Sequence, residues 1–367
     1  MNKINILFLI VYTLISSSCD RSELPYSELS KKTIIVYMAA DNDLSYDAIA
    51  DIEEMKQGFP KTKNNLIVFA DINGKPPYLL KIDREKGTVI KSYPELDSTD
   101  PTTLAEITKE VIRLYPAEEY GLILWSHGTS WLPAAATLRS FGKDAGSANG
   151  SGMNIPELAK SLPAKFDFII MDACLMGAVE VAYELRSNTD LIIASSTETI
   201  ANGFPYDEII PELMEPVINY QSVAKHYYDY YNNMSGAYRS ATISVVNTHY
   251  LEALSHQLKL LFESNNAQVS LTDRESIQHL DIYEEQYAFD LLDFVKNIFT
   301  TTDVDDFINI LNQVVIYKAH TPMFLSKYKI KTYCGLSSYI PDQEMERLNL
   351  YYKTLEWYNA AGIYNLF

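Results

Sequence analysis

The sequence predicts an α/β protein in which helices cover both faces of a mainly parallel central sheet, followed by a smaller, mostly helical C-terminal lobe. Segments with strand-like and helix-like patterns alternate from residue 33 to about residue 211. The predicted strands are near-continuous apolar runs, which is typical of parallel strands buried on both faces. With 367 residues, of which 47% are apolar and 21% charged, the chain can bury a large core, and wholesale disorder is excluded.

The first part of the chain provides the strands and helices of the predicted sheet. Apolar, β-branched runs predict strands, and apolar residues at helical spacing predict helices between them. Asp100 and Pro101 are suited to begin a helix, and Pro116 is suited to end it. Strands are predicted at 33–39, 64–73, 120–128, 166–174 and 191–198, with a hairpin at 78–93, and helices at 41–58, 102–116, 154–163 and 179–186.

A change in composition near residue 211 predicts two parts after the N-terminal segment. Residues 33–211 form the main domain, and residues 212–367 form a C-terminal lobe rich in aromatic helical segments. Strand patterns at 241–247 and 333–341 indicate that strands of the lobe rejoin the main sheet. Within the main domain, the segment 144–152 is rich in Gly, Ser and Asn, which predicts an exposed, mobile loop.

The beginning of the chain has the pattern of an export signal. The apolar run after Lys3 is too short to span a membrane as a helix. The serines before Cys19 resemble the lipobox of bacterial lipoproteins, so we expect a signal peptide at 1–18, a lipid on Cys19 and a polar tether at 19–32. The folded part would then be anchored to a bacterial membrane, at the periplasmic or cell-surface face of the outer membrane. An ordinary signal with a chance cysteine is the alternative, because Ser16 stands where a lipobox usually has Leu.

The charge balance indicates which ligands the protein could bind, and the cysteine count indicates what kind of scaffold it has. Thirty Lys and Arg residues against 48 Asp and Glu give a net charge of -18, which argues against a phosphate-binding face for nucleic acid. A negative surface instead favours cationic ligands, including peptides rich in Lys or Arg. Three cysteines are too few for a disulfide-stapled scaffold of this length.

One cysteine and one histidine each close a predicted strand. Cys174 ends the strand at 166–174, and His127 lies at the end of the strand at 120–128. The carboxyl ends of parallel strands meet at one edge of a sheet, where ligands bind. A thiolate that attacks a carbonyl carbon and an imidazole that moves protons are the minimum for thiol-based acyl transfer. Their interval is similar to the roughly 50 residues between histidine and cysteine in caspases. Without His127 and the surrounding sequence, the simplest interpretation of Cys174 would be a buried core residue, because cysteine is among the most buried residue types.

A set of strings extends over nearly all of the mature chain. They are TIIVYMAADNDL (33–44), LILWSHG (122–128), MDACLMGAVEVAYEL (171–185), ASSTETIANGFPY (194–206), FDLLDF (289–294) and GLSSYIP (335–341). DACLM followed by a helix with the pattern VEVAYEL is the most specific of them. In these strings the chain resembles the clostripain-type cysteine peptidases, relatives of caspases, gingipains and legumain. The resemblance implies a caspase-like α/β fold and cysteine endopeptidase activity.

The resemblance also implies roles for the residues at the predicted sheet edge. Cys174 would be the nucleophile, and His127 the base and then the acid for the leaving amine. The backbone N–H groups of Gly128 and Cys174 would form the oxyanion hole. Relatives commonly have HGGGW at the histidine, whereas this chain has Thr129 and Ser130 in place of two glycines. The edge of the pocket is therefore expected to differ.

The resemblance further implies cleavage after Arg or Lys, and self-processing in the 133–152 loop. Asp172, two residues before the nucleophile, would line the pocket for the P1 side chain, because a carboxylate suits a cation. A second acidic contact is expected after residue 196, from Glu198 or Asp207. Candidate self-cleavage sites follow Lys143, which we prefer, and Arg139. The protein is expected to be a monomer, either intact or cut into two chains that stay together.

Two functions from different classes are compatible with the sequence. The first is a lipid-anchored cysteine endopeptidase that acts on polypeptides with basic P1 residues. The alternative is a catalytically silent surface lipoprotein that uses the same fold as a binding or scaffolding module. No cofactor or metal is expected, because the histidines share no metal-ligand spacing, although some relatives need calcium.

Overall fold

The structure is a computed structural model that describes residues 28–84, 86–133, 141–145, 152–264, 274–299 and 304–366. The predicted signal peptide and Cys19 lie outside these residues. None of the helices in the described ranges is long and apolar enough to cross a membrane.

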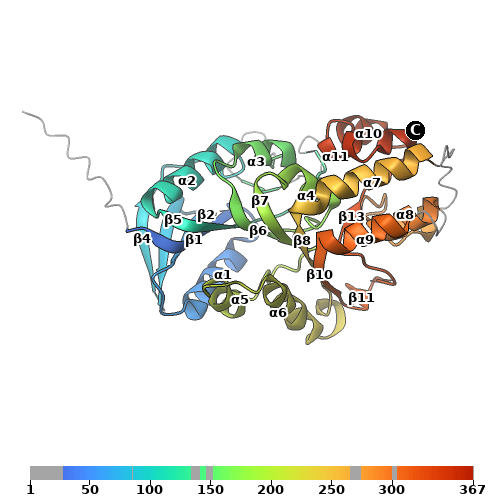
Figure 1. The fold of residues 1–367 in the computed structure, drawn as a ribbon. Coiled ribbons are helices and arrows are strands. Elements are labelled where there is room, and N and C mark those ends of the chain that lie inside the picture. The colour runs from blue at the N-terminus through green and yellow to red at the C-terminus, as the bar shows by residue number, and fades with distance from the viewer. Residues whose placement is uncertain are drawn as a thin grey trace, which may run out of the picture.

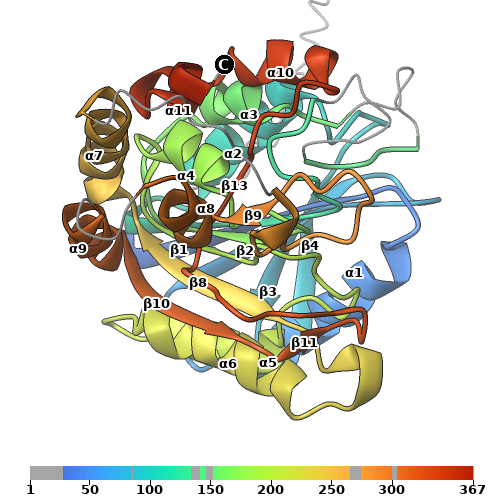
Figure 2. The ribbon, with the colours of Figure 1, turned by 90° about the vertical axis from the view of Figure 1, so that its right-hand side faces the viewer.

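A large central sheet organises the molecule (Figures 1 and 2). Its central strands β7, β6, β5, β1 and β2 are parallel, and the strands at both edges are antiparallel. Within the described residues the strand order is β10 (Val315–His320), β8 (Thr242–Asn247), β7 (Thr189–Ala194), β6 (Phe166–Asp172), β5 (Ala117–Trp125), β1 (Ser30–Ala40), β2 (Asn65–Ile72), β3 (Tyr78–Asp83) and β4 (Lys86–Ser92). The predicted α/β class with a mainly parallel, doubly covered sheet is confirmed.

Helices cover both faces of the sheet because its strands alternate apolar side chains between the faces. In β1, Ile35 and Tyr37 pack into the core on one face, and Ile34 and Val36 pack into the core on the other. The first core is covered by α2 (Pro101–Leu114), α3 (Ile155–Ser161), α4 (Val179–Leu185), α7 (Leu251–Ser264), α8 (Leu291–Ile298), α9 (Asp305–Val314), α10 (Glu346–Tyr352) and α11 (Glu356–Ala360). The second core is covered by α1 (Ser45–Gly58), α5 (Tyr206–Leu213) and α6 (Tyr220–Asn232), which lie below the sheet in Figure 1.

The C-terminal region extends the main sheet and also adds small elements around it. β8 pairs with β7 and β10 pairs with β8, so one edge of the sheet is built from residues beyond 211. The expectation that the segment 333–341 also joins this sheet is wrong, because β10 pairs with β8 in its place and the segment 333–341 contributes to a separate pair. Two short antiparallel pairs join β9 (Phe289–Asp290) with β13 (Ser337–Ser338) and β11 (Met323–Phe324) with β12 (Tyr328–Lys329). Short 3-10 turns lie at Gly236–Tyr238, Thr248–Tyr250, Arg274–Ser276 and Ile363–Leu366.

The boundary of the expected tether differs from the structure. β1 begins at Ser30, so the last three residues of the segment 19–32 belong to the sheet. Lys32 is buried, and its ammonium group donates to the carbonyl oxygens of Leu213 and Glu215 at 3.2 and 2.7 Å. Lys32 can be buried, although its neighbours in the sequence are polar, because its ammonium group donates hydrogen bonds to these two carbonyl oxygens.

Candidate active site

The ends of β5 and β6 bring the predicted catalytic residues to one edge of the sheet. Trp125 on β5 lies opposite Asp172 on β6 in parallel register, and His127 and Cys174 each follow two residues later. Both line one open pocket with a volume of about 180 Å³. The remaining lining residues are Leu44, Trp125, Ser126, Asp172, Ala173, Thr199, Ile200, Ala201 and Gly203.

Cys174 is half-buried, and its thiol is held by the backbone of a neighbouring loop. The Sγ atom accepts from the Thr199 N–H at 3.3 Å and donates to the Thr199 carbonyl oxygen at 3.6 Å. Burial, with smaller contributions from the acidic residues Glu198 and Asp172, raises the pKa of the Cys174 thiol to about 12. The thiol is therefore neutral in this arrangement, and becoming a thiolate requires a base that also stabilises its charge.

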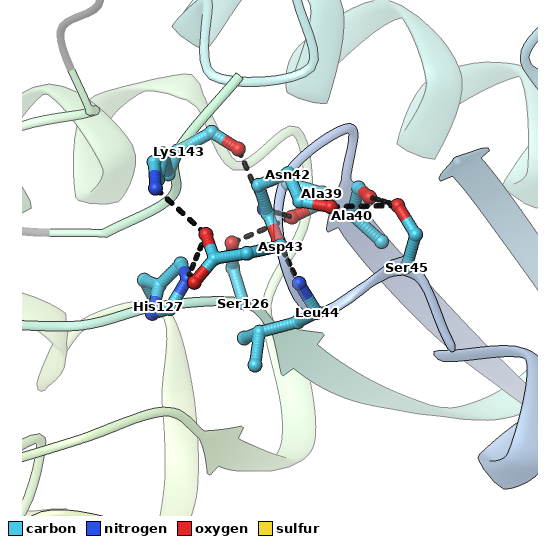
Figure 3. A network of polar contacts seen from close by, with 9 residues as sticks. All are labelled: Ala39, Ala40, Asn42, Asp43, Leu44, Ser45, Ser126, His127 and Lys143. Carbon is cyan, nitrogen blue, oxygen red and sulfur yellow. Dashed lines mark hydrogen bonds and ion pairs between the residues drawn. The ribbon is translucent and has the colours of Figure 1, made fainter. Parts of the chain in front are cut away.

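The imidazole of His127 contacts a carboxylate group. Its Nε2 atom lies 3.1 Å from Oδ1 of Asp43, which follows β1, and the same oxygen lies 2.7 Å from Nζ of Lys143 (Figure 3). Among the described hydrogen bonds, the imidazole is joined to Asp43 and the thiol to Thr199, so His127 and Cys174 share the pocket without a direct bond. The side chain of His127 is 33% exposed, which leaves the ring accessible from the pocket.

The loop after His127 approaches the cysteine closely. A Cβ atom added at Gly128 would lie 2.7 Å from the carbonyl oxygen of Cys174, so only glycine fits there. Ser130 has a φ of 60°, a left-handed conformation that favours glycine. Ser130 thus has the backbone conformation of a glycine, although its side chain is that of a serine.

Asp172 lines the pocket and is 4% exposed. Its Oδ2 atom accepts from the hydroxyl of Tyr206 at 2.8 Å and from the N–H of Phe204 at 3.2 Å. Burial raises the pKa of Asp172 to about 6, and these hydrogen bonds oppose that rise. An added Cβ at Gly203 would lie 2.7 Å from Oδ2, so the absence of a side chain there leaves room for the buried carboxyl group.

The two alternatives for a second acidic contact lie outside this lining. Glu198 turns to another loop, where its Oε1 atom accepts from the N–H of Ile282 at 3.1 Å, and burial raises its pKa to about 7. Asp207 is exposed in the first turn of α5. Of the three predicted pocket acids, only Asp172 is among the residues that line the pocket.

Residues 141–145 of the expected self-cleavage segment belong to the part of the chain that the structure describes. The expectation of an exposed loop at 144–152 is wrong for Asp144, which is buried and accepts from the N–H and the hydroxyl group of Ser98 at 2.8 and 3.1 Å. These two hydrogen bonds from Ser98 allow the carboxylate of Asp144 to be buried, whereas the polar composition of the segment predicted that it would be exposed. Lys143 is half-exposed and bound to Asp43, and Arg139 lies outside the described residues.

Sequence reasoning missed Asp43, Asn42 and Thr199. The first two belong to the string DNDL at 41–44, directly after the predicted strand at 33–39, so their place at the same sheet edge was a signal in the sequence. Thr199 carried no signal, because its contact with Cys174 uses only backbone groups. In the described part of the chain, no group of three or more His, Cys, Asp or Glu side chains is arranged to hold a metal ion.

Comparison with known proteins decides the family. A sequence model of the clostripain family, peptidase family C11, matches residues 36–364. The chain belongs to the clostripain family. Clostripain from Hathewaya histolytica is 29% identical over 222 residues, which is 50% of this chain and 42% of clostripain. The chain thus matches less than half the length of that relative.

Solved structures of clostripain-family proteases have the same fold. An inactive zymogen of a C11 protease from Parabacteroides distasonis is 30% identical, with a TM-score of 0.80 over 92% of this chain and 99% of that one. A secreted C11 cysteine protease from Bacteroides thetaiotaomicron, bound to an irreversible peptide inhibitor, is 31% identical, with a TM-score of 0.79 over 90% and 99%. A clostripain from the same organism, in complex with the peptide inhibitor BTN-VLTK-AOMK, is 28% identical, with a TM-score of 0.54 over 59% and 97%.

Proposed function

We propose that this clostripain-family protein is a cysteine endopeptidase that cleaves peptide bonds after Lys or Arg, with Cys174 as nucleophile and His127 as acid and base. The observation that carries the proposal is the common pocket of Cys174, His127 and the buried carboxyl group of Asp172. A pocket that combines a nucleophile, a proton carrier and one deep acid is suited to acyl transfer on a substrate with a cationic side chain.

The proposed reaction uses only groups of the protein and water, so we expect it to need no cofactor. His127 takes the thiol proton, and the Cys174 sulfur attacks the carbonyl carbon of the substrate. The tetrahedral oxyanion is stabilised by the N–H groups of Cys174 and Gly128, and the imidazolium gives its proton to the leaving amine. A water molecule, deprotonated by His127, then attacks the thioester, and the sulfur leaves as the acid product is released.

Specificity for a basic P1 residue rests on Asp172. The Tyr206 hydroxyl and the Phe204 N–H hold one oxygen of this carboxyl group in place, which favours a charge-assisted bond to an ammonium or guanidinium group. The inhibitor of the B. thetaiotaomicron clostripain contains the peptide VLTK, which ends in lysine. Both facts support Lys or Arg at P1, and neither Glu198 nor Asp207 is needed for this proposal.

Fluorogenic peptides that differ only at P1 test the proposal. We expect hydrolysis of the Arg and Lys peptides, little hydrolysis of the Asp and Leu peptides, and no hydrolysis by Cys174→Ala. An equal rate for Cys174→Ala would reject the nucleophile, and a preference for Asp or Leu would reject the pocket. Failure of an Arg-directed chloromethyl ketone to label Cys174 in processed protein would favour the silent binding module.

We further propose export, lipid attachment at Cys19 and self-cleavage after Lys143. A secreted relative and a zymogen relative support export and maturation. The mass of the mature protein reports the lipid and any internal cut together. An unmodified N-terminus would reject the lipid, and a cut that persists in Cys174→Ala would reject self-cleavage.

A further inference from the structure

Asp43 lies on a turn whose backbone is fixed by its neighbours. The Asn42 side chain accepts from the Leu44 N–H at 2.8 Å and donates to the Ala39 carbonyl at 3.0 Å. The Ser45 hydroxyl lies 2.6 Å from the Ala40 carbonyl oxygen, and Figure 3 shows these contacts surrounding the base of the turn. The Asp43 side chain is 64% exposed, but these hydrogen bonds hold the turn that carries it, and its carboxylate lies beside His127 and Lys143.

The ammonium group of Lys143 and the imidazole of His127 meet at a single oxygen of this carboxylate. Oδ1 of Asp43 lies 2.7 Å from Nζ of Lys143 and 3.1 Å from Nε2 of His127. The bond to Lys143, with a smaller contribution from His127, lowers the pKa of Asp43 to about 2 against the opposing effect of burial. Asp43 is therefore a carboxylate at every pH at which the protein is expected to work.

A carboxylate at Nε2 has a defined effect on an imidazole. It accepts a hydrogen bond from the Nε2–H group, which fixes the tautomer and leaves Nδ1 as the nitrogen that exchanges a proton with the thiol. It also stabilises the imidazolium that forms when the thiol is deprotonated, as the acid of a catalytic triad does. For a thiol whose pKa burial raises to about 12, such stabilisation decides how much reactive thiolate forms.

We propose that Asp43 is the positioning residue of His127, and that Lys143 competes for the same carboxylate oxygen while the segment 141–145 stays docked. This inference rests on the proposed role of His127 in catalysis. When Lys143 is held, the carboxylate is shared between two cations. When Lys143 leaves, the whole negative charge is available to the imidazolium.

The docked position of Lys143 is built by the same turn. The Asn42 amide donates to the carbonyl oxygen of Lys143 at 2.7 Å, and the N–H of Ala145 donates to the Asp41 carbonyl at 2.7 Å. The N–H of Gly142 donates to the His127 carbonyl at 2.9 Å. In this arrangement the Lys143 side chain lies on Asp43, and its own carbonyl group is turned to Asn42. Cleavage after Lys143 therefore requires this segment to detach first, which would also release Asp43.

The other titratable groups around the site lie in the pocket lining or act on Cys174. Cys174 and Asp172 line it from β6 and the residues that follow, and Glu198 acts on Cys174. Among the ion pairs of the described residues, Asp43 contacts the imidazole directly, and Lys143 reaches it through the shared oxygen of Asp43.

The variant Asp43→Asn tests the positioning role in the full chain, with Asp47→Asn as a control that makes the same charge change in the first turn of α1. We expect Asp43→Asn to lower kcat by about 10- to 100-fold with KM nearly unchanged, since part of the acid-base contribution is lost. The acidic limb of kcat/KM should move to lower pH, because the imidazolium loses the carboxylate that stabilises it and His127 then loses its proton at lower pH. The pH dependence of Cys174 alkylation by iodoacetamide should shift in the same direction. Unchanged kcat and unchanged pH profiles, with Asp47→Asn behaving identically, would overturn the role of Asp43.

The competition is tested in uncut protein that carries Cys174→Ala, by following the His127 ring signal in NMR as pH changes. Adding Lys143→Met should raise the titration midpoint by roughly half a pH unit or more, because a neighbouring opposite charge favours the charged form. This rise should vanish when Asp43→Asn is also present. No rise, or an equal rise without Asp43, would overturn the competition. Because neither this readout nor alkylation involves peptide cleavage, failure of the proposed P1 specificity would leave both results interpretable.

Discussion

At the residue scale, the position of the sulfur depends on an unusual backbone conformation. Leu175, directly after Cys174, has a φ of 64°, which costs a non-glycine residue of order 1 to 3 kcal/mol. Its N–H donates to the Thr197 carbonyl at 2.9 Å, and its side chain packs with Leu280 and Phe324. These contacts hold the sharp turn that directs Cys174 to the pocket.

The pocket carboxyl group predicts a pH dependence of substrate binding. Burial raises the pKa of Asp172 to about 6, so the group is charged above that pH and neutral below it. We expect KM for Arg and Lys peptides to rise as pH falls through about 6, by roughly 10-fold or more for the loss of a charge-assisted bond. The measurement is KM between pH 5 and 8.

Asp172→Asn provides the control for this prediction. Its KM should be high and nearly independent of pH, because asparagine imitates the neutral acid. A wild-type KM that does not change across pH 6, or a variant that keeps the same change, would contradict the assignment of Asp172.

At the element scale, the loop after β5 is anchored through Trp131. This side chain is 1% exposed and packs on Tyr339, Tyr351 and Tyr352, which belong to the C-terminal residues and α10. Buried Glu180 of α4 accepts from the hydroxyl group of Tyr352 at 2.9 Å and so holds the same cluster on the sheet. The C-terminal region thus supports the loop that carries His127.

Trp131→Ala is expected to affect both stability and activity. Loss of a buried tryptophan should lower the free energy of unfolding by about 3 to 5 kcal/mol. It should also lower kcat/KM in protein that is still folded, because the loop that carries His127 and Gly128 loses its anchor. Chemical unfolding and peptide hydrolysis on the same samples measure the two effects.

A matched variant separates these effects. Trp357 on α11 is equally buried and packs on Tyr183, away from the pocket. Trp357→Ala should have a similar stability cost with kcat/KM close to wild type. Equal losses of activity in both variants would mean that stability alone explains the effect of Trp131.

At the scale of the whole molecule, buried acids make stability depend on pH. Burial raises the pKa of Asp51 to about 9, of Asp71 and Glu180 to about 7, and of Asp172 to about 6. Between the ordinary carboxyl range and about pH 9, the folded chain holds protons that the unfolded chain releases. Stability must therefore fall as pH rises, by about 1.4 kcal/mol per pH unit for each proton held. Asp43, with a pKa of about 2, acts in the opposite sense only at pH below this window.

We expect the free energy of unfolding to be larger at pH 5.5 than at pH 8.5. Asp51→Asn should reduce this difference, because asparagine does not titrate in this range and its carbonyl oxygen can still accept from Trp125, whose Nε1 lies 2.7 Å from Asp51. Asp83→Asn, on an exposed residue, should keep the wild-type difference. Urea unfolding at the two pH values measures it, and greater stability at pH 8.5 would contradict the prediction.

Much of the fold could be predicted because it depends on local pattern. The apolar runs at β1 and β6 predicted buried parallel strands, and His127 and Cys174 were placed at one edge by the geometry of such a sheet. The contribution of Asp43 and Lys143 could not be predicted. Their meeting requires a turn after β1 and a segment after β5 to lie side by side, which no local spacing encodes.

The α/β class, the family and the residues that could carry thiol chemistry can all be read from the chain, because periodicity and motif strings are local properties. The choice of Asp172 over Glu198 and Asp207 as the acid that lines the pocket needs the folded structure, as does the carboxylate that His127 shares with Lys143. Burial and hydrogen-bond partners fix the charge and direction of a side chain, and they come from segments far apart in the sequence.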